Sequence, residues 1–249
     1  MVLQVRRWLL IILVPLLFIT GCASTDAELQ FAALDSPNFT VYYTEKDESA
    51  AQDVLAELEA NGRRIIDDLH PVKTGKYAIR IYPDLKTFHR AMDMPEAPDG
   101  VVGAAWSDSE MRMVSPANPG PTKSYQSMLQ VAVHEFAHCV TARLAAENDS
   151  SACIWLWESI SLYEARQERS LSDLPYMQTG GFPRFLDFTD AMQSSDIYQL
   201  GYTVGDYVVQ NWGWKGIRDL VLNGGDVTRA LGVTEDEFYA GWYGFARVK

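Results

Sequence analysis

The sequence is short of basic charge and has few cysteines, few histidines and one long apolar run. Among its 249 residues, 21 are Lys or Arg and 33 are Asp or Glu, which gives a formal net charge of −12. Nucleic-acid binding depends on clustered Lys and Arg, so this balance argues against a nucleic-acid partner. It also argues against a polybasic membrane patch. No Asp- and Asn-rich calcium loop is present.

The three cysteines are Cys22, Cys139 and Cys153. In an exported protein, a disulfide between Cys139 and Cys153 would close the loop between two predicted helices. Two buried free thiols are the alternative, because the sequence gives no distance between the α-carbons. Cys139 is a poor metal-ligand candidate, since it follows His138 and points about 100° away around a helix.

The apolar run, Trp8–Phe18, follows Arg6 and Arg7 and ends shortly before Cys22. This layout is that of a secretory signal. A transmembrane anchor is the alternative, but the run is shorter than the roughly 20 apolar residues that a spanning helix needs.

The segment resembles a bacterial lipoprotein signal, in which cleavage falls before the cysteine. The resemblance implies a signal peptide over residues 1–21, a lipid on Cys22 and membrane attachment outside the cytoplasm. Ala23 rather than aspartate follows the cysteine. In a bacterium with two membranes, this implies the outer membrane.

Residues 22–36 read as a polar tether, and residues 37–249 as one domain. Alternating and β-branched patterns predict strands at 39–43, 77–82, 101–106 and 111–114. Apolar residues at helical spacing predict helices at 48–69, 85–92, 124–145, 155–169, 198–212, 214–222 and 234–247. Residues 170–196 read as irregular. A β-containing half followed by a helical half is an α+β arrangement.

The sequence His134-Glu135-Phe136-Ala137-His138 is an HExxH motif within the predicted helix at 124–145. Residues four apart lie one turn along the same face, so both imidazoles can reach one metal ion. Glu135 lies on the neighbouring flank, where it can touch a metal-bound water. Two ordinary histidines on an amphipathic helix are the alternative. The other histidines, His70 and His89, are expected on helical surfaces.

Catalytic zinc sites commonly use three protein ligands, so a third donor is needed. Glu158 follows His138 after 19 intervening residues, within Trp155-Leu156-Trp157-Glu158-Ser159. HEFAH followed by WLWES resembles the gluzincin metallopeptidases, specifically the peptidase MA-like group related to thermolysin and the M1 aminopeptidases. Ser159 replaces the commoner glycine. The likeness extends over roughly residues 38–246.

This resemblance implies a zincin-like fold with one Zn²⁺ per chain, held by His134, His138 and Glu158. Glu135 would act as the general base on water. Tyr198, in a Tyr-x-x-Gly stretch like that of the M1 aminopeptidases, would stabilise the oxyanion. Tyr202, four residues on, is the alternative.

In gluzincins, an edge strand before the motif helix pairs with the extended substrate. Gly103, Ala104 and Ala105 are the corresponding residues, and their small side chains allow close approach of a peptide. The acidic anchor of M1 aminopeptidases is missing from this stretch, which favours an endopeptidase acting on a peptide or protein substrate.

Two other functions are compatible with the sequence. One is a catalytically silent, lipid-tethered binding module on the same fold. The other is a zinc hydrolase acting on a cell-wall peptide or ester, since the chemistry of zinc-activated water is shared. The oligomeric state is not readable from the sequence.

Overall fold

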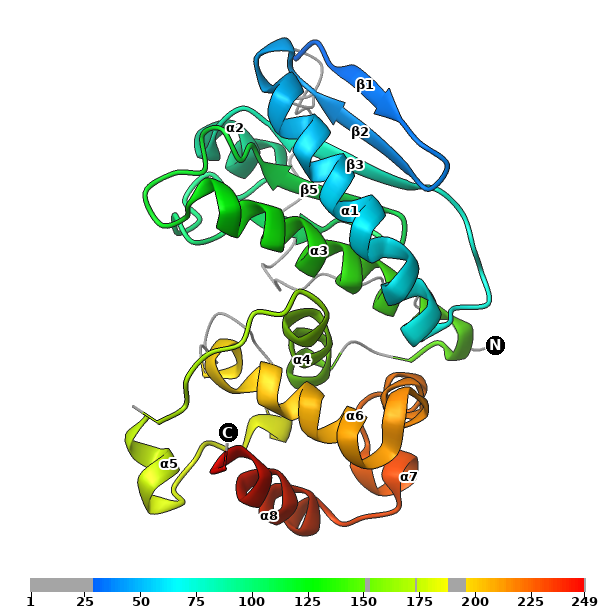
Figure 1. Ribbon diagram of the computed structural model, residues 1–249, viewed down its shortest axis with the longest axis vertical. Helices are drawn as coiled ribbons and strands as arrows, with labels where there is room; N and C mark the ends of the chain where they lie inside the picture. The colour runs from blue at the N-terminus through cyan, green and yellow to red at the C-terminus, as the bar shows by residue number, and fades with distance from the viewer. Residues whose placement is uncertain (1–28, 151–152, 173, 188–195, 249) are drawn as a thin grey trace, which may run out of the picture.

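The computed structural model describes residues 29–150, 153–172, 174–187 and 196–248 (Figure 1). The predicted signal peptide and Cys22 lie outside these residues. Within the described chain, no helix is long and apolar enough to cross a membrane. The structure combines helices with one mixed sheet, which confirms the predicted α+β class.

The sheet has five strands in the order β1-β2-β3-β5-β4. Their bounds are β1 Ala32–Asp35, β2 Phe39–Tyr43, β3 Tyr77–Tyr82, β4 Gly103–Ala105 and β5 Glu110–Val114. The three central strands β2, β3 and β5 run parallel, whereas β1 and β4 are antiparallel edge strands. Parallel neighbours require a crossover connection, and the helix α1 (Glu48–Leu69) supplies the one between β2 and β3.

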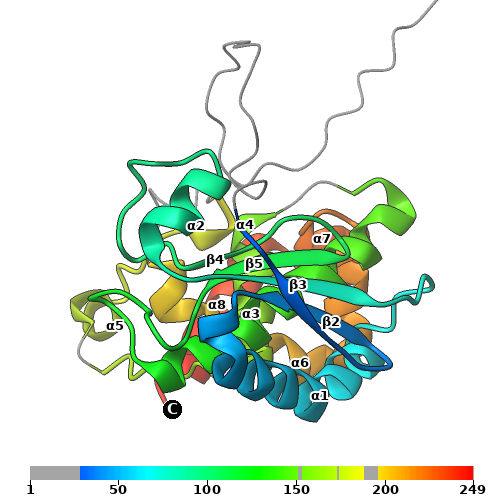
Figure 2. The same ribbon diagram turned by 90° about the horizontal axis from the view of Figure 1, so that it is seen from above.

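Two long helices, α1 and α3 (Tyr125–Ala145), pack against the sheet and against each other (Figures 1 and 2). The shorter α2 (Leu85–Ala91) contacts β3 and β5. Short 3-10 turns flank α1 and α3 at Glu45–Asp47 and Ala146–Asn148. Together these elements form the β-containing half, residues 29–150.

Phe136, inside the HExxH motif, anchors α3 to the sheet. Its ring meets Phe39 of β2 and Tyr77 of β3 edge to face, with centroid separations of 5.1 and 4.8 Å. All three side chains are buried. Such aromatic pairs contribute about 0.5–1.5 kcal/mol each beyond the area that they bury. The packing therefore fixes the rotation of α3 and turns the two histidines away from the sheet.

The second part, residues 153–248, is the helical half. It contains α4 Ile154–Glu164, α5 Pro175–Thr179, a 3-10 turn at Phe185–Asp187, α6 Ile197–Leu222, α7 Val227–Leu231 and α8 Glu235–Ala246. The helix α4 lies between α3 of the β-containing half and α6 (Figure 1). It is apolar on nearly every side, as expected for a helix enclosed by others.

Close packing between α4 and α6 depends on glycine at position 205. A Cβ added there would lie 2.8 Å from the Ser159 carbonyl oxygen of α4. Farther along, α6 is interrupted at Gly213, whose φ of 66° is left-handed. Two predicted helices, 198–212 and 214–222, therefore exist on either side of this kink, with no separate loop between them.

Several predicted boundaries were wrong. Strand β1 lies inside the predicted tether, so the fold begins earlier than expected. Helix α4 ends at Glu164, five residues before the predicted end, because Arg166 adopts a left-handed conformation with φ of 53°. The segment read as irregular contains α5, and α7 was not predicted.

His89 is not on a helical surface, as the sequence had suggested. Its side chain is buried, and its Nε2 pairs with the Val101 carbonyl oxygen at 2.8 Å. This contact holds α2 to the segment that precedes β4. His70 is exposed, as predicted, at the C-terminus of α1.

Candidate active site

The site begins on α3, where His134 and His138 lie one helical turn apart. Their Nε2 atoms are 3.1 Å from each other, and both side chains are buried. The helix starts with a capping box at Ser124, whose side chain accepts from the Ser127 backbone N–H. The predicted motif helix is therefore confirmed.

Glu158 reaches this imidazole pair from α4. Its Oε2 lies 3.3 Å from His134 Nε2, and its Oε1 lies 3.7 Å from His138 Nε2. One ligand atom from each residue falls within 4.8 Å of the other two, so the three side chains could hold a metal ion. Among the described residues, no other such group of His, Cys, Asp or Glu is found.

The donor set fits a metal in its chemistry and in its unmet polar contacts. Two imidazole nitrogens and one carboxylate are a common ligand set for catalytic zinc. Glu158 Oε2, which faces His134 Nε2, is buried without a hydrogen-bond partner in the described chain. Burial alone would raise the pKa of Glu158, but the electrostatic effect of the neighbouring His138 and His134 outweighs burial and lowers that pKa. The carboxylate is therefore held in its ionised form, which is the form that could bind a metal ion.

Gln167 orients the first histidine, with His134 Nδ1 lying 3.0 Å from Gln167 Oε1. An amide oxygen can only accept, so Nδ1 carries the proton and Nε2 presents its lone pair to the site. Gln167 reaches this position because α4 ends in a Schellman turn. The backbone N–H of Gln167 donates to the Leu162 carbonyl, and that of Arg166 donates to Tyr163. No sequence pattern indicated this role, because residue 167 fell inside a predicted helix.

Glu135 lies on the flank of α3 that faces β4. Burial raises its pKa to about 7, while His134 and a backbone hydrogen bond from Ala105 act in the opposite direction. A Cβ added at Gly103 would lie 3.0 Å from the Glu135 carboxylate oxygen Oε1. The strand and the carboxylate are therefore packed as closely as glycine permits, and a pKa near neutrality suits proton transfer.

Two tyrosines of α6 were candidates for the oxyanion donor. The Tyr198 hydroxyl donates to Glu158 Oε1 at 3.3 Å and therefore lies beside the possible ligands. Tyr202 instead packs its ring against Tyr163, with centroids 5.5 Å apart. The structure brings Tyr198 to the site and directs Tyr202 toward the α4–α6 contact.

A cavity of about 600 Å³ opens beside these groups. Its walls come from the β4 segment, the start of α3, the end of α4 and the first turn of α6. The lining includes Gly103, Lys123, His134, Glu135, Arg166, Gln167, Glu168, Arg169 and Tyr198. The predicted base, one histidine and the predicted strand thus share a cavity large enough for several peptide residues.

The proposed disulfide is not formed, since Cys139 and Cys153 are both free. The Cys139 thiol faces the Glu110 carbonyl oxygen of β5, on the sheet side of α3. Burial raises its pKa well above the usual value, which favours the neutral thiol. Cys153 lies at the start of α4 beside Gly225. The two side chains face different elements, which explains why they are not bridged.

No model of a known protein family matches the chain, and no curated protein matches it.

Proposed function

We propose that this protein is a zincin-like metallopeptidase of the gluzincin type, which hydrolyses peptide bonds outside the cytoplasm. The observation that carries the proposal is the convergence of His134, His138 and Glu158 from two helices. The predicted signal and lipid on Cys22 supply the proposed location. The proposed cofactor is one zinc ion per chain, held by these three side chains.

When bound, zinc supplies a Lewis acid that polarises a carbonyl and lowers the pKa of a water. Glu135 takes the proton from the attacking water and later delivers it to the leaving amine. Burial of this carboxyl, which raises its pKa to about 7 in the metal-free chain, favours uptake of the proton from water. The hydrogen bond to Gln167 keeps the His134 lone pair available throughout.

The remaining groups position the substrate and its developing charge. Tyr198, whose hydroxyl lies near Glu158, turns to donate to the oxyanion. On its side away from β5, strand β4 is an edge of the sheet. An extended peptide pairs with this edge through main-chain hydrogen bonds. The packing of Gly103 on Glu135 brings that peptide beside the base.

The test is a matched pair of full-length chains in detergent, the parent and Glu135→Gln. Both are expected to bind about one zinc, because Glu135 is not a ligand, whereas only the parent cleaves a peptide library. Zinc content is measured by elemental analysis, and cleavage by mass spectrometry. Glu96→Gln, at an exposed position, is the control and is expected to keep full activity.

Two outcomes separate the alternatives. Zinc binding without cleavage of any peptide would favour the silent binding module. Cleavage restricted to cross-linked wall peptides or esters would favour the other hydrolase. Peptide cleavage that persists in Glu135→Gln would contradict the mechanism. Fragments with cuts in the interior of long peptides would establish the endopeptidase mode.

A further inference from the structure

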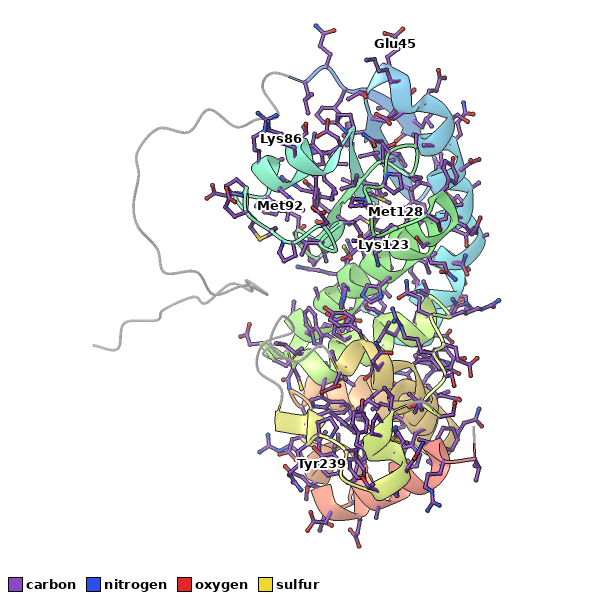
Figure 3. All side chains as sticks on the ribbon, turned by 90° about the vertical axis from the view of Figure 1, so that its left-hand side faces the viewer. Glu45, Lys86, Met92, Lys123, Met128 and Tyr239 are labelled. Carbon is purple, nitrogen blue, oxygen red and sulfur yellow. The ribbon has the colours of Figure 1, made fainter. Side chains whose placement is uncertain are left out.

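The cavity beside Glu135 carries an unusual concentration of positive charge. Lys123, Arg166 and Arg169 all line it, although acidic residues outnumber basic ones by 33 to 21 in the chain. Lys123 precedes α3 on the β-containing half, toward the helical half (Figure 3). Arg166 and Arg169 come from the segment after α4. Two separate parts of the fold therefore bring their cations to one cavity.

None of these three cations has a carboxylate within ion-pair distance among the described residues. Several other cations of the described chain do form such pairs: Arg63, Arg64 and Lys215, for example, each pair with an acid on their own helix. Glu135 and Glu168 also line the cavity, but neither lies within ion-pair distance of these three cations. The cavity therefore offers three cations that form no ion pair with a side chain of the described chain.

Two features of these cations are energetically unfavourable in the folded chain. Burial and the neighbouring charge of Arg169 lower the pKa of Lys123, and Glu135 only partly counteracts them. Arg166 takes a left-handed conformation where glycine is the usual choice. Like charges held together without an acidic partner are unfavourable, and an anion between them would relieve the repulsion.

Resting on the proposed function, we propose that this cavity recognises a carboxylate of the peptide substrate through Lys123, Arg166 and Arg169. The cations lie in the cavity that also contains the base, so the recognised carboxylate belongs to a residue close to the cleaved bond. An acidic side chain and a free C-terminus present the same group. At physiological salt, charges are screened beyond about 8 Å, so these nearby cations outweigh the acidic surface elsewhere.

The test uses three labelled, N-acetylated alanine-based peptides. One has a central glutamate and an amidated end, one has glutamine instead, and one has glutamine with a free C-terminal carboxylate. Binding is measured by fluorescence anisotropy on the full chain in detergent with a chelator. Under that condition neither cleavage nor metal–carboxylate contact contributes. The kcat/KM on the zinc-loaded chain is measured separately.

We expect a carboxylate peptide to bind about tenfold more tightly than the glutamine amide, as is typical of charge-assisted hydrogen bonds. The Lys123→Gln/Arg169→Gln double variant should lose this preference, and 0.5 M salt should weaken it. Arg63→Gln removes an exposed cation outside the cavity and should keep it. Tighter binding of the glutamate peptide would show that the recognised carboxylate is an acidic side chain. Tighter binding of the peptide with a free C-terminus would show that it is the C-terminal carboxylate.

Equal binding of all three peptides, or a preference that survives in the double variant, would overturn the proposal. If circular dichroism shows that the double variant does not fold, the single variant Arg169→Gln is tested in its place. Arg169 is exposed, so its replacement should not disturb folding. The binding measurement tests this inference independently of the proposed peptidase activity, because it involves neither metal nor cleavage. A chain that cleaves nothing but prefers carboxylates would contradict the peptidase and support the recognition site.

Discussion

The hydrogen bond between His134 and Gln167 determines which imidazole nitrogen faces Glu158. Replacing Gln167 with alanine would leave Nδ1 without its acceptor and allow the ring to rotate or change tautomer. We expect zinc affinity to fall about 10- to 100-fold, as is usual when such an outer contact is lost. Competition with a chromophoric chelator measures this change.

Two further variants distinguish positioning from general damage at residue 167. Gln167→Glu keeps an acceptor oxygen at the same place and should retain most of the affinity. Gln52→Ala, on the exposed side of α1, should leave it unchanged. Unaltered affinity in Gln167→Ala would show that the amide does not position the histidine.

A second residue, Glu164, links stability to pH. Its side chain is fully buried against Arg64, and burial raises its pKa to about 7 from the ordinary 4.5, although Arg64 opposes the shift. The folded chain therefore holds this proton more tightly than the unfolded chain does. The free energy of unfolding should fall as pH rises through the window between these two values, by about 3 kcal/mol at most.

The variant Glu164→Gln removes this titration. Relative to the parent, its free energy of unfolding should increase between pH 4.5 and pH 8, although it loses an ionic contact to Arg64. Urea unfolding at both pH values measures the difference, and Glu96→Gln is the exposed control. A relative loss of stability toward pH 8 would mean that the ion pair outweighs the burial of the charge.

Individual residue types in the HExxH-x19-E pattern were enough to predict the grouping of His134, His138 and Glu158. The role of Gln167 could not be predicted in that way, because it depends on a left-handed turn at an arginine. Likewise, the burial of His89 follows from a carbonyl twelve residues away along the chain. The local sequence pattern therefore predicts the grouping of the possible ligands. It does not predict side-chain contacts that depend on a turn or on a residue farther along the chain.

The packing of α4 against α6 determines where Glu158 lies relative to α3. Gly205→Ala would place a methyl group 2.8 Å from the Ser159 carbonyl and 2.9 Å from Tyr163 Cβ. The helices must separate, which should cost about 1–3 kcal/mol of stability. Because Ser159 follows Glu158, zinc affinity should fall as well.

Gly244→Ala is the matched control, since nothing lies within 4 Å of a Cβ added at that position in α8. Alanine is the better helix former by about 1 kcal/mol, so this variant should be unchanged or slightly more stable. Thermal unfolding and zinc titration compare the two variants. Equal behaviour would show that close α4–α6 packing does not position Glu158.

Helices and strands with strong periodicity were predicted accurately. The helix at 48–69 and the strand at 77–82 match α1 and β3 at both ends. In contrast, α7 has five residues, and β1 is an exposed edge strand of four. Elements this short do not repeat their pattern often enough to be recognised, and neighbouring elements in the chain stabilise them: β2 pairs with β1, and α6 and α8 contact α7.

The proposed zinc ion would join the two halves of the protein, because two ligands belong to α3 and the third to α4. Zinc should therefore raise the thermal midpoint of the full chain, by the equivalent of about 4 kcal/mol at a thousandfold excess over its dissociation constant. Calorimetry with zinc and with a chelator measures the shift. His138→Ala should abolish it, whereas His70→Ala, at an exposed position, should not.

The arrangement of the halves was only partly foreseeable. The order of a β-containing part and a helical part follows from the pattern along the chain. The pattern does not predict that Lys123 lines the same cavity as Arg166 and Arg169, because more than forty residues separate Lys123 from the two arginines in the sequence. The charge count indicated only that acidic residues outnumber basic ones.

The ligands and cavity walls are spread from strand β4 to the first turn of α6. A chain that ends at residue 150, through interrupted synthesis or a proteolytic cut, has two of the three donors and lacks Tyr198. Such a fragment has only an incomplete ligand set, even with its sheet intact. Completion of the proposed centre therefore requires the chain as far as Tyr198, so a copy cut short before α4 would lack the proposed hydrolytic activity.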